Sequence, residues 1–136
     1  MGEVHICFVL KSSAIGLGNA ESFESDYQNI YKPLGKFIYA HQSFRMAFAF
    51  NGVVLSFFHK KHPEFIDILQ EMVARKQVEI LGGGYYDPGF PLLFPMDRTG
   101  QIEKLSSEIR QTTKKRPRGI AICASIWESS LVSCFS

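Results

Sequence analysis

The sequence predicts an α/β fold organised around a parallel β-sheet. Short, continuous apolar runs rich in β-branched or aromatic residues are typical of strands that are covered on both faces. Longer stretches with apolar residues at spacings of three and four separate these runs and indicate helices. Strands that alternate with helices of this length form right-handed βαβ units. The architecture is therefore either a doubly wound sheet or an arc of a (β/α) barrel.

Four segments are predicted to be strands: residues 4–10, 44–50, 78–81 and 119–123. Polar and apolar residues alternate only weakly within them, which predicts cover on both faces. Cys7 and Cys123 lie in two of these apolar runs. Both are expected to be buried thiols that pack as small hydrophobic side chains.

The first helical stretch follows Ser22, which is predicted to be its N-cap. An apolar stripe runs along this stretch at helical spacing, formed by Phe23, Tyr27, Ile30, Tyr31, Leu34 and Ile38. Pro33 and Gly35 lie inside the stripe. Because proline lacks a backbone N–H and clashes with the preceding turn, a kink or break is expected there.

Three further helices are predicted. Asn51 caps a short one that continues through Phe57 and Phe58, and Pro63 suits the first turn of the next. The apolar face of that second helix runs as far as Lys76 and is formed by Phe65, Ile66, Leu69, Met72 and Val73. Asp97 is predicted to cap the last helix, which is expected to bury Ile102, Leu105 and Ile109.

Composition indicates an ordinary globular protein. With 136 residues, 46% hydrophobic and 21% charged, the chain is predicted to form one small domain, residues 1–136. One dense basic run, Lys114-Lys115-Arg116-Pro117-Arg118, follows the last helix. Such a run either binds nucleic acid or is a solvated loop at a helix end. The second interpretation is favoured, so no nucleic-acid partner is expected.

Metal, cofactor and membrane sites are not expected. The cysteines show no Cys-x-x-Cys spacing, and Gly82-Gly83-Gly84 is not followed by the Gly-Lys-Ser/Thr of a phosphate loop. No apolar run approaches the roughly 18 residues of a membrane helix, and the first residues do not resemble a signal peptide. A reduced, cytoplasmic location is expected.

Several motifs together resemble glycoside hydrolase family 57, the family of α-amylases and 4-α-glucanotransferases. They are His62-Pro63-Glu64-Phe65-Ile66-Asp67-Ile68-Leu69, Gln77-Val78-Glu79-Ile80-Leu81-Gly82-Gly83-Gly84-Tyr85-Tyr86-Asp87-Pro88, Asp97-Arg98-Thr99-Gly100-Gln101-Ile102 and Arg116-Pro117-Arg118-Gly119. The resemblance spans roughly residues 4–131. It implies that the chain is the N-terminal part of an incomplete parallel (β/α) barrel of seven strands, and that its substrate is an α-glucan or maltooligosaccharide.

The same resemblance implies that this chain has lost its catalytic residues. The family uses a Glu nucleophile and a second carboxylate as acid/base in a retaining mechanism. In the segment Cys123-Ala124-Ser125-Ile126-Trp127-Glu128-Ser129 the nucleophile position is Ala124, and a methyl group cannot attack an anomeric carbon. The family's His-x-His-Gln-Pro motif is replaced by Lys11-Ser12-Ser13-Ala14-Ile15. The acid/base Asp would lie on a later strand. We therefore expect a truncated pseudoenzyme with no catalytic residue.

Four residues are candidates for substrate binding. Asp87 follows a strand at the end where barrel active sites are built, although an Asp can also simply hold the turn before Pro88. Tyr86 offers a stacking face, as do Tyr85, Phe90 and Phe94, but aromatic side chains more often pack in a core. Trp127 and Glu128 match family positions. Glu128, four residues after Ala124, is not expected to replace the nucleophile, because four residues of strand span roughly 13 Å.

Three functional hypotheses remain open at this stage. The chain is an inactive homologue of glucan hydrolases, a non-catalytic glucan-binding or regulatory module, or one part of an enzyme completed by another chain. An incomplete barrel also leaves an open sheet edge. The chain is therefore expected to be a marginally stable monomer, or to dimerise or aggregate through that edge.

Overall fold

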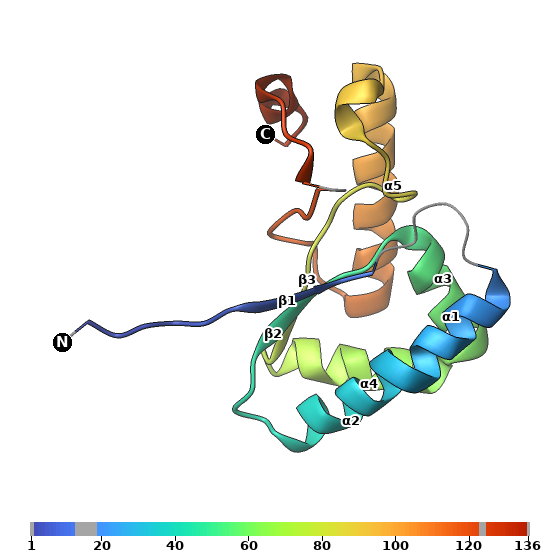
Figure 1. Ribbon diagram of the computed structural model, residues 1–136, viewed down its shortest axis with the longest axis vertical. Helices are drawn as coiled ribbons and strands as arrows, with labels where there is room; N and C mark the ends of the chain where they lie inside the picture. The colour runs from blue at the N-terminus through green and yellow to red at the C-terminus, as the bar shows by residue number, and fades with distance from the viewer. Residues whose placement is uncertain (1, 13–18, 123–124, 136) are drawn as a thin grey trace.

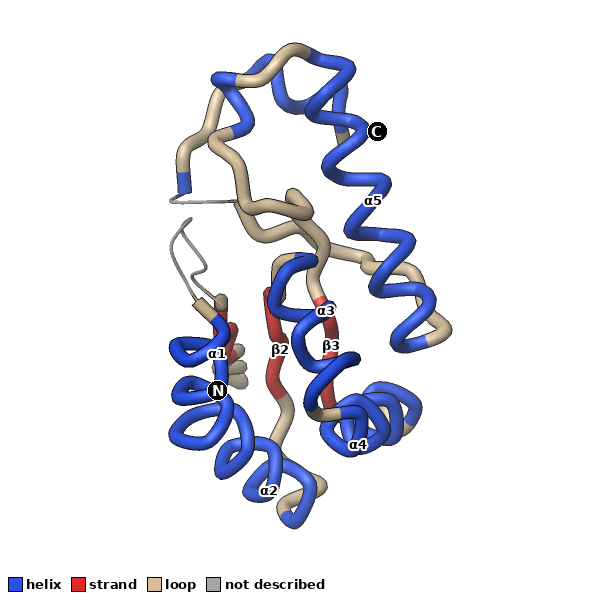
Figure 2. Tube along the Cα trace, turned by 90° about the vertical axis from the view of Figure 1, so that its right-hand side faces the viewer, coloured by secondary structure: helices blue, strands red, loops and turns tan. Residues whose placement is uncertain are grey.

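The computed structural model describes residues 2–12, 19–122 and 125–135. At its centre is a three-stranded parallel sheet in the order β1-β2-β3, with helices between the strands (Figures 1 and 2). The predicted α/β fold with a parallel sheet is confirmed. The elements along the chain are β1 (Phe8–Lys11), α1 (Ala20–Asp26), the π-helix η1 (Tyr27–Tyr31), α2 (Lys32–Ala40), β2 (Met46–Ala49), α3 (Gly52–Lys61), α4 (Pro63–Ala74), β3 (Val78–Ile80), the 3₁₀ helix η2 (Phe90–Leu92), α5 (Pro95–Thr113) and the 3₁₀ helix η4 (Ser129–Cys134).

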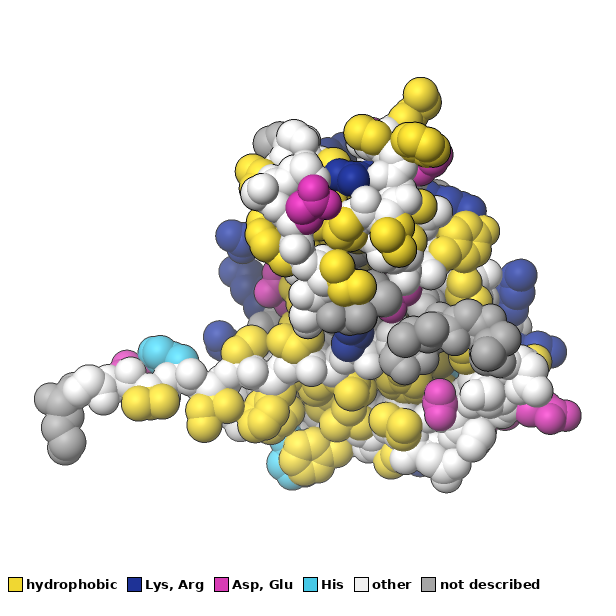
Figure 3. Space-filling model, turned by 45° about the horizontal axis from the view of Figure 1, so that its top comes forward, with side chains coloured by type: hydrophobic (Ala, Val, Ile, Leu, Met, Phe, Trp, Pro, Cys, Tyr) yellow, Lys and Arg dark blue, Asp and Glu magenta, His cyan; other side chains and the backbone are white. Residues whose placement is uncertain are grey.

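The first strand is shorter than predicted. β1 begins at Phe8, which pairs with Met46, the first residue of β2, so the described residues before Phe8 extend past the end of the neighbouring strand. Val4 and Ile6 are 84% and 75% exposed, and hydrophobic side chains line this N-terminal arm in Figure 3. The prediction that Cys7 is buried is wrong for the same reason, since Cys7 is exposed. Cys123 lies outside the described residues.

The prediction of cover on both faces is confirmed for the central strand and is wrong for β1, where Phe8 and Val9 are 52% and 53% exposed. All four residues of β2 are buried, and its two neighbours in the sheet are β1 and β3. In Figure 2, helices α1–α4 lie in the lower part of the molecule, with α1 and α3 drawn in front of the strands, and α5 stands in the upper part with the C-terminal segment. The ring of Phe50 at the end of β2 packs between Phe48 and Phe58, with centroid distances of 5.0 and 5.6 Å. This aromatic layer ties the sheet to α3.

The first helix begins earlier than predicted. Asn19, not Ser22, is the N-cap: its side-chain oxygen accepts a hydrogen bond from the backbone N–H of Ser22 at 2.8 Å. Asparagine caps helices as well as serine does. The cap therefore moves three residues toward the N-terminus, and the helix gains most of a turn.

A π-helical turn precedes Pro33. The N–H of Lys32 donates to the carbonyl of Tyr27, five residues back. The wider turn shifts the apolar stripe around the helix, so Tyr27 and Tyr31 are buried while Ile30 is 45% exposed. Of the predicted kink or break near Pro33, the break does not occur, because the chain stays helical from Ala20 to Ala40, and the irregularity is a change of hydrogen-bond pattern just before the proline.

The other helix starts follow the sequence with one exception. The side chain of Asn51 accepts from the N–H of Val54, as predicted, and α4 begins at Pro63. The predicted apolar face of α4 is fully buried. The exception is Asp97, which lies in the first turn of α5 because that helix already begins at Pro95, where proline is favoured.

The predicted fourth strand is reduced to a single parallel bridge between Gly82 and Ile120. The N–H of Gly82 donates to Gly119 at 2.8 Å, and the N–H of Ala121 donates to Gly82 at 3.0 Å. The segment thus reaches the correct edge of the sheet, beside β3. Pro117, three residues before the bridge, has no N–H to donate, which limits the ladder on that side.

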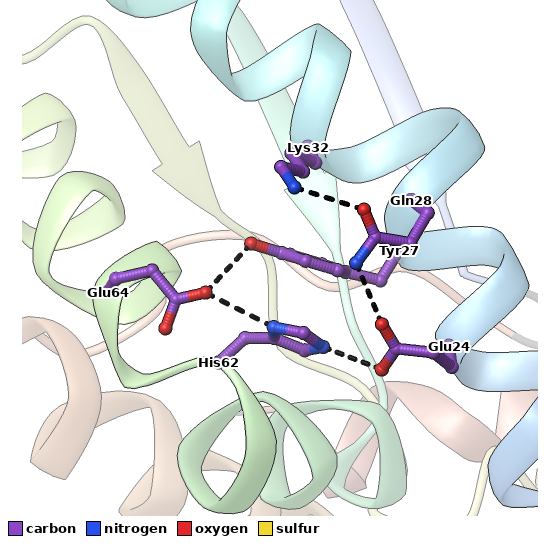
Figure 4. A network of polar contacts seen from close by, with 6 residues as sticks. All are labelled: Glu24, Tyr27, Gln28, Lys32, His62 and Glu64. Atoms are coloured by element: carbon purple, nitrogen blue, oxygen red, sulfur yellow. Dashed lines mark hydrogen bonds and ion pairs between the residues drawn. The ribbon is translucent and has the colours of Figure 1, made fainter.

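His62 joins the N-terminal helices to α4 (Figure 4). Its Nε2 lies 2.7 Å from a carboxylate oxygen of Glu24, and its Nδ1 lies 3.1 Å from Glu64. The imidazole stacks on the ring of Tyr27 with 3.5 Å between centroids, and the Tyr27 hydroxyl donates to Glu64 at 3.1 Å. One buried imidazole therefore holds three segments of the chain together.

This cluster perturbs the acidities of its members. The side-chain hydrogen bonds from Gln28 and then His62 lower the pKa of Glu24. The backbone N–H of Glu64, followed by His62 and Tyr27, lowers the pKa of its carboxyl. Burial, reinforced by the neighbouring Glu64, raises the pKa of Tyr27 to about 12. The charged carboxylates and the neutral phenol are thus the forms that the folded state favours.

Candidate functional site

The C-terminal ends of the three strands meet at one edge of the sheet. Lys11 ends β1, Asn51 follows β2 by two residues, and the Gly82–Asp87 loop follows β3. In (β/α) barrels this edge carries the active site, because the loops that follow the strands converge there. The candidate site is therefore built from Lys11, Ser12, Asn51 and the loop of residues 82–87.

Lys11, at the end of β1, contacts both the loop that follows β3 and the segment that ends at Ile122. Its ammonium lies 3.5 Å from a carboxylate oxygen of Asp87 and donates to the carbonyl of Ile122 at 2.8 Å. The Asp87 side chain is only 7% exposed, against 31% for Lys11. A carboxylate buried to this degree needs a partner. Lys11 supplies it and ties the loop after β3 to the residue just before the segment that contains Ala124.

Asp87 also shapes its own loop. Its backbone lies in the left-handed region with φ 53°, which aspartate tolerates better than most residues. The N–H of Asp87 donates to the carbonyl of Gly84 at 3.1 Å. The turn before Pro88 that the sequence suggested is thus present, and the carboxylate is at the same time turned toward β1.

Ser12 and Asn51 form a buried polar pair beside Lys11. The Ser12 hydroxyl donates to the carbonyl of Ala49 at 3.3 Å and accepts from the N–H of Asn51 at 3.2 Å. The side-chain oxygen of Asn51 caps α3, which leaves its amide nitrogen, buried and without a partner among the described residues. This amide nitrogen is a buried hydrogen-bond donor close to the C-terminal end of β2.

Two tyrosines are held against α5. The N–H groups of Tyr85 and Tyr86 donate to the backbone and side-chain oxygens of Gln101 at 3.2 and 2.9 Å. The ammonium of Lys104 lies over both rings, 4.1 and 4.8 Å from their centroids. Burial raises the pKa of the Tyr85 phenol. Tyr86 is 57% exposed and presents a stacking face to solvent, whereas Tyr85 covers Gly52, where a Cβ would lie 2.1 Å from its ring.

The remaining aromatic candidates differ from one another. Phe90 is 1% exposed and belongs to the packing, whereas Phe94 is 80% exposed. Trp127 is 57% exposed and stacks on Phe135 with 6.4 Å between centroids. Glu128 is exposed and precedes η4, where its carbonyl accepts from the N–H of Leu131 at 3.0 Å.

The structure therefore brings only part of the candidate set together. Asp87 and Tyr86 are neighbours in one loop, and Asp87 reaches Lys11. For Trp127 and Glu128, the contacts in the described part of the chain are with their own C-terminal segment. Ala124 and residues 13–15 lie outside the described residues.

Arg98 anchors that C-terminal segment. Its guanidinium donates to the carbonyls of Leu93 and Pro91 at 2.9 and 3.2 Å and to the hydroxyl of Ser130 at 3.2 Å. Arg98 is 8% exposed, and its neutralising contacts in the described residues are these dipoles rather than a carboxylate. The residue joins η2, α5 and η4.

Sequence reasoning missed Lys11, the Asn51 amide and Lys104 as members of the site. The lysine was visible only as a departure from the family's histidine motif, and its partner lies far along the chain. Asn51 was recognised as a cap, which uses its oxygen and says nothing of its nitrogen. Lys104 is one charge among many on a helix, and nothing in its spacing marks it.

The described residues contain neither a cluster of metal-binding side chains nor a helix that could span a membrane. No group of three or more His, Cys, Asp or Glu side chains there is placed to hold a metal ion. None of the helices that the structure describes has the length and apolar character needed to cross a membrane.

Comparison with known proteins identifies the family. The model of glycosyl hydrolase family 57 matches residues 10–136. Alpha-amylase 1 of Dictyoglomus thermophilum is 35% identical over 109 residues, which cover 80% of this chain and 16% of that protein. A 4-alpha-glucanotransferase of Thermococcus kodakarensis is 30% identical over 109 residues, with the same coverage of 80% and 16%.

The fold agrees with this match. The crystal structure of 4-alpha-glucanotransferase from Thermococcus litoralis superposes with a TM-score of 0.87 and 24% identity, covering 96% of this chain and 21% of that one. The chain thus spans about a fifth or less of the relatives it matches. The predicted architecture, the N-terminal part of a parallel (β/α) barrel, is confirmed. The chain belongs to glycosyl hydrolase family 57.

Proposed function

We propose that residues 1–136 form the N-terminal segment of an α-glucan-active domain, and that this segment binds α-glucan without cleaving it. The related proteins named above are an α-amylase and 4-α-glucanotransferases, which supports a maltooligosaccharide as the ligand. The observation that carries the proposal is the Lys11–Asp87 pair at the C-terminal edge of the sheet. Lys11 lies in the segment that replaces the family's histidine motif.

The chemistry of this edge supports binding rather than catalysis. A retaining glycosidase needs two carboxylates about 5–5.5 Å apart, one of them free to attack the anomeric carbon. Asp87 is buried and paired with Lys11, and the nucleophile position is occupied by Ala124. Without a nucleophile, no glycosyl-enzyme intermediate can form at this position.

Groups suited to a sugar are nevertheless present. The exposed ring of Tyr86 offers a face for stacking, and Trp127 offers a second one. We assign Asp87, Tyr86, Trp127 and Glu128 as the substrate-binding residues. The alternative, a regulatory module, makes the same contacts and differs only in what binding controls.

Calorimetry and a turnover assay with maltoheptaose test the proposal on the same sample. We expect measurable heat of binding, weaker for Tyr86→Ala and Trp127→Ala than for Phe37→Ala, an exposed aromatic on α2. No reducing sugar should be released over hours. Release of reducing sugar by the purified chain that is lost in Glu128→Gln would overturn the non-catalytic assignment, and absence of heat at millimolar sugar would rule out glucan binding.

We also propose that the chain self-associates through β1. β1 forms one edge of the sheet, and Phe8 and Val9 on it are 52% and 53% exposed. An apolar edge strand is a template for pairing with a second copy. Sedimentation velocity should show a concentration-dependent dimer that Val9→Lys abolishes, with Val132→Lys as the matched control. A monomer at all concentrations would contradict this.

A cytoplasmic location is part of the same proposal. Cys7 is a free, exposed thiol. Such a thiol persists in a reducing compartment and is readily oxidised elsewhere.

A further inference from the structure

A cavity of about 480 Å³ opens at the end of the sheet opposite the candidate functional site. Residues that precede each strand line it: Cys7 before β1, Arg45 before β2 and Gln77 before β3. The loop that follows α5 completes the wall with Lys115, Arg116 and Arg118. The basic run noted in the sequence is therefore one side of a concave site and not an isolated surface loop.

Positive charge dominates this cavity. Its cationic lining residues are Arg45, Lys76, Lys115, Arg116 and Arg118, and its one acidic lining residue in the described chain is Glu79. Lys115 already donates to the carbonyl of Val73 at 3.1 Å. The other four make no side-chain hydrogen bond or ion pair within the described part of the chain. In Figure 3, Lys and Arg side chains gather beside the base of the N-terminal arm.

The wall of the cavity is apolar where the cations are absent. Met46, Val78 and Ile80 from the sheet and Ile109 from α5 contribute to it. A volume of this size lies within the roughly 300–1,000 Å³ of small-molecule sites. An apolar surface next to convergent cations suits a ligand with an anionic group at one end and a weakly polar body at the other.

We propose that this cavity binds a phosphorylated small molecule. Arginine side chains hold phosphate oxygens with paired N–H donors, and three arginines line the site. A nucleic-acid strand is a poorer match, because the cations line an open concavity and do not follow a line along the surface. The site is independent of the proposed glucan function, since it lies at the other end of the sheet.

Calorimetry of the whole chain with phenyl phosphate and inorganic phosphate tests the proposal. Phenyl phosphate should bind more tightly than inorganic phosphate because its ring covers the apolar wall. Arg118→Gln should weaken phenyl phosphate binding about tenfold, the typical effect of removing one charge-assisted contact. Glu79→Gln should strengthen it, because the one carboxylate in the cavity repels the ligand.

Two lysine variants, one inside the cavity and one outside it, distinguish binding in the cavity from general electrostatic attraction to a basic protein. Lys76→Gln should weaken binding several-fold, whereas Lys60→Gln, at the exposed end of α3, should leave it unchanged. Thermal unfolding of each variant shows that it is folded, and maltoheptaose binding should be unaffected by Arg118→Gln.

Three results would overturn the inference. They are the absence of phenyl phosphate binding at millimolar concentration, an equal loss in Lys60→Gln, or displacement of phenyl phosphate by a single-stranded oligonucleotide that binds far more tightly. The last outcome would identify a nucleic-acid surface instead.

Discussion

Lys11 and Asp87 lie 3.5 Å apart, although one ends the first strand and the other follows the third. β2 lies between those two strands in the sheet. The pair therefore spans the edge of the sheet above β2. The Asp87 side chain is 7% exposed, so its carboxylate has little access to water and Lys11 is its ion-pair partner.

Removing Lys11 should destabilise the fold more than removing both charges. We expect Lys11→Met to lower the free energy of unfolding by roughly 2 kcal/mol, because it leaves a buried carboxylate unpaired. Lys11→Met combined with Asp87→Asn should recover most of this loss, since Asn also tolerates the left-handed backbone at that position. Urea unfolding of the unsubstituted protein, the two single variants and the double variant measures the coupling free energy between the two side chains. Additive effects would show that the two side chains do not interact.

His62 should be the most sensitive histidine in the chain. Its ring is buried, stacked on Tyr27 and bonded to two carboxylates. We expect His62→Ala to lower the free energy of unfolding by about 2 kcal/mol, in the range for a disrupted buried network. His5→Ala, on the exposed N-terminal arm, is the matched control and should have no effect. Equal midpoints for the two variants in urea would argue against a structural role.

Acidification should weaken the fold through Glu24 and Glu64. The pKa of each carboxyl is lowered below its ordinary value of 4.5, by hydrogen bonds from Gln28 and His62 at Glu24 and by the backbone N–H at Glu64. The stabilisation is therefore present above the unfolded-state pKa and is lost as the pH falls through the folded-state pKa. Urea midpoints should fall between about pH 5 and pH 3. The double variant Glu24→Gln, Glu64→Gln should show a smaller fall than Glu103→Gln, an exposed control on α5.

Alkali should act through the buried tyrosines. Burial raises the pKa of both Tyr27 and Tyr31 from 10.0 to about 12. Their stabilising contribution is complete below the unfolded-state pKa near 10 and is lost as the pH rises toward 12. Circular dichroism should show unfolding in that window, together with tyrosinate absorbance. Tyr31→Phe should move the transition to higher pH, and the exposed Tyr86→Phe should not move it.

Two glycines should respond in opposite directions to alanine. A Cβ on Gly52 would lie 2.1 Å from the ring of Tyr85, whereas nothing lies within 4 Å of a Cβ on Gly100. Gly100→Ala should stabilise the protein by up to about 1 kcal/mol, since Gly100 lies inside α5. Gly52→Ala should destabilise it, and Tyr85→Leu should restore part of the loss. Thermal unfolding midpoints of the variants measure these effects. A stabilising Gly52→Ala would show that the Tyr85 ring does not pack against Gly52.

Sequence reasoning predicted the order of the elements because hydrophobic periodicity is a local property. The apolar face of α4 and the Asn51 cap need only neighbouring residues, and both predictions were correct. The ends of β1 could not be predicted in this way. Its start at Phe8 is set by where β2 begins, which is a pairing between distant segments.

The candidate site shows the same division. Asp87 was predicted because it follows a strand and Tyr86 because its ring offers a stacking face, and the two do lie together in the loop after β3. Lys11 as the partner of Asp87 required the sheet to be folded first. For Trp127 and Glu128, assignment as binding residues remains a prediction.

The three hydrogen bonds of Arg98 have a mechanical consequence. They fasten Ser130 to α5 and to the carbonyls that precede that helix. The last described residues are thus positioned by α5, while Lys11 on β1 holds the chain at Ile122 through a hydrogen bond to its carbonyl. The chain is therefore anchored at Ile122 to β1 through Lys11 and at Ser130 to α5 through Arg98.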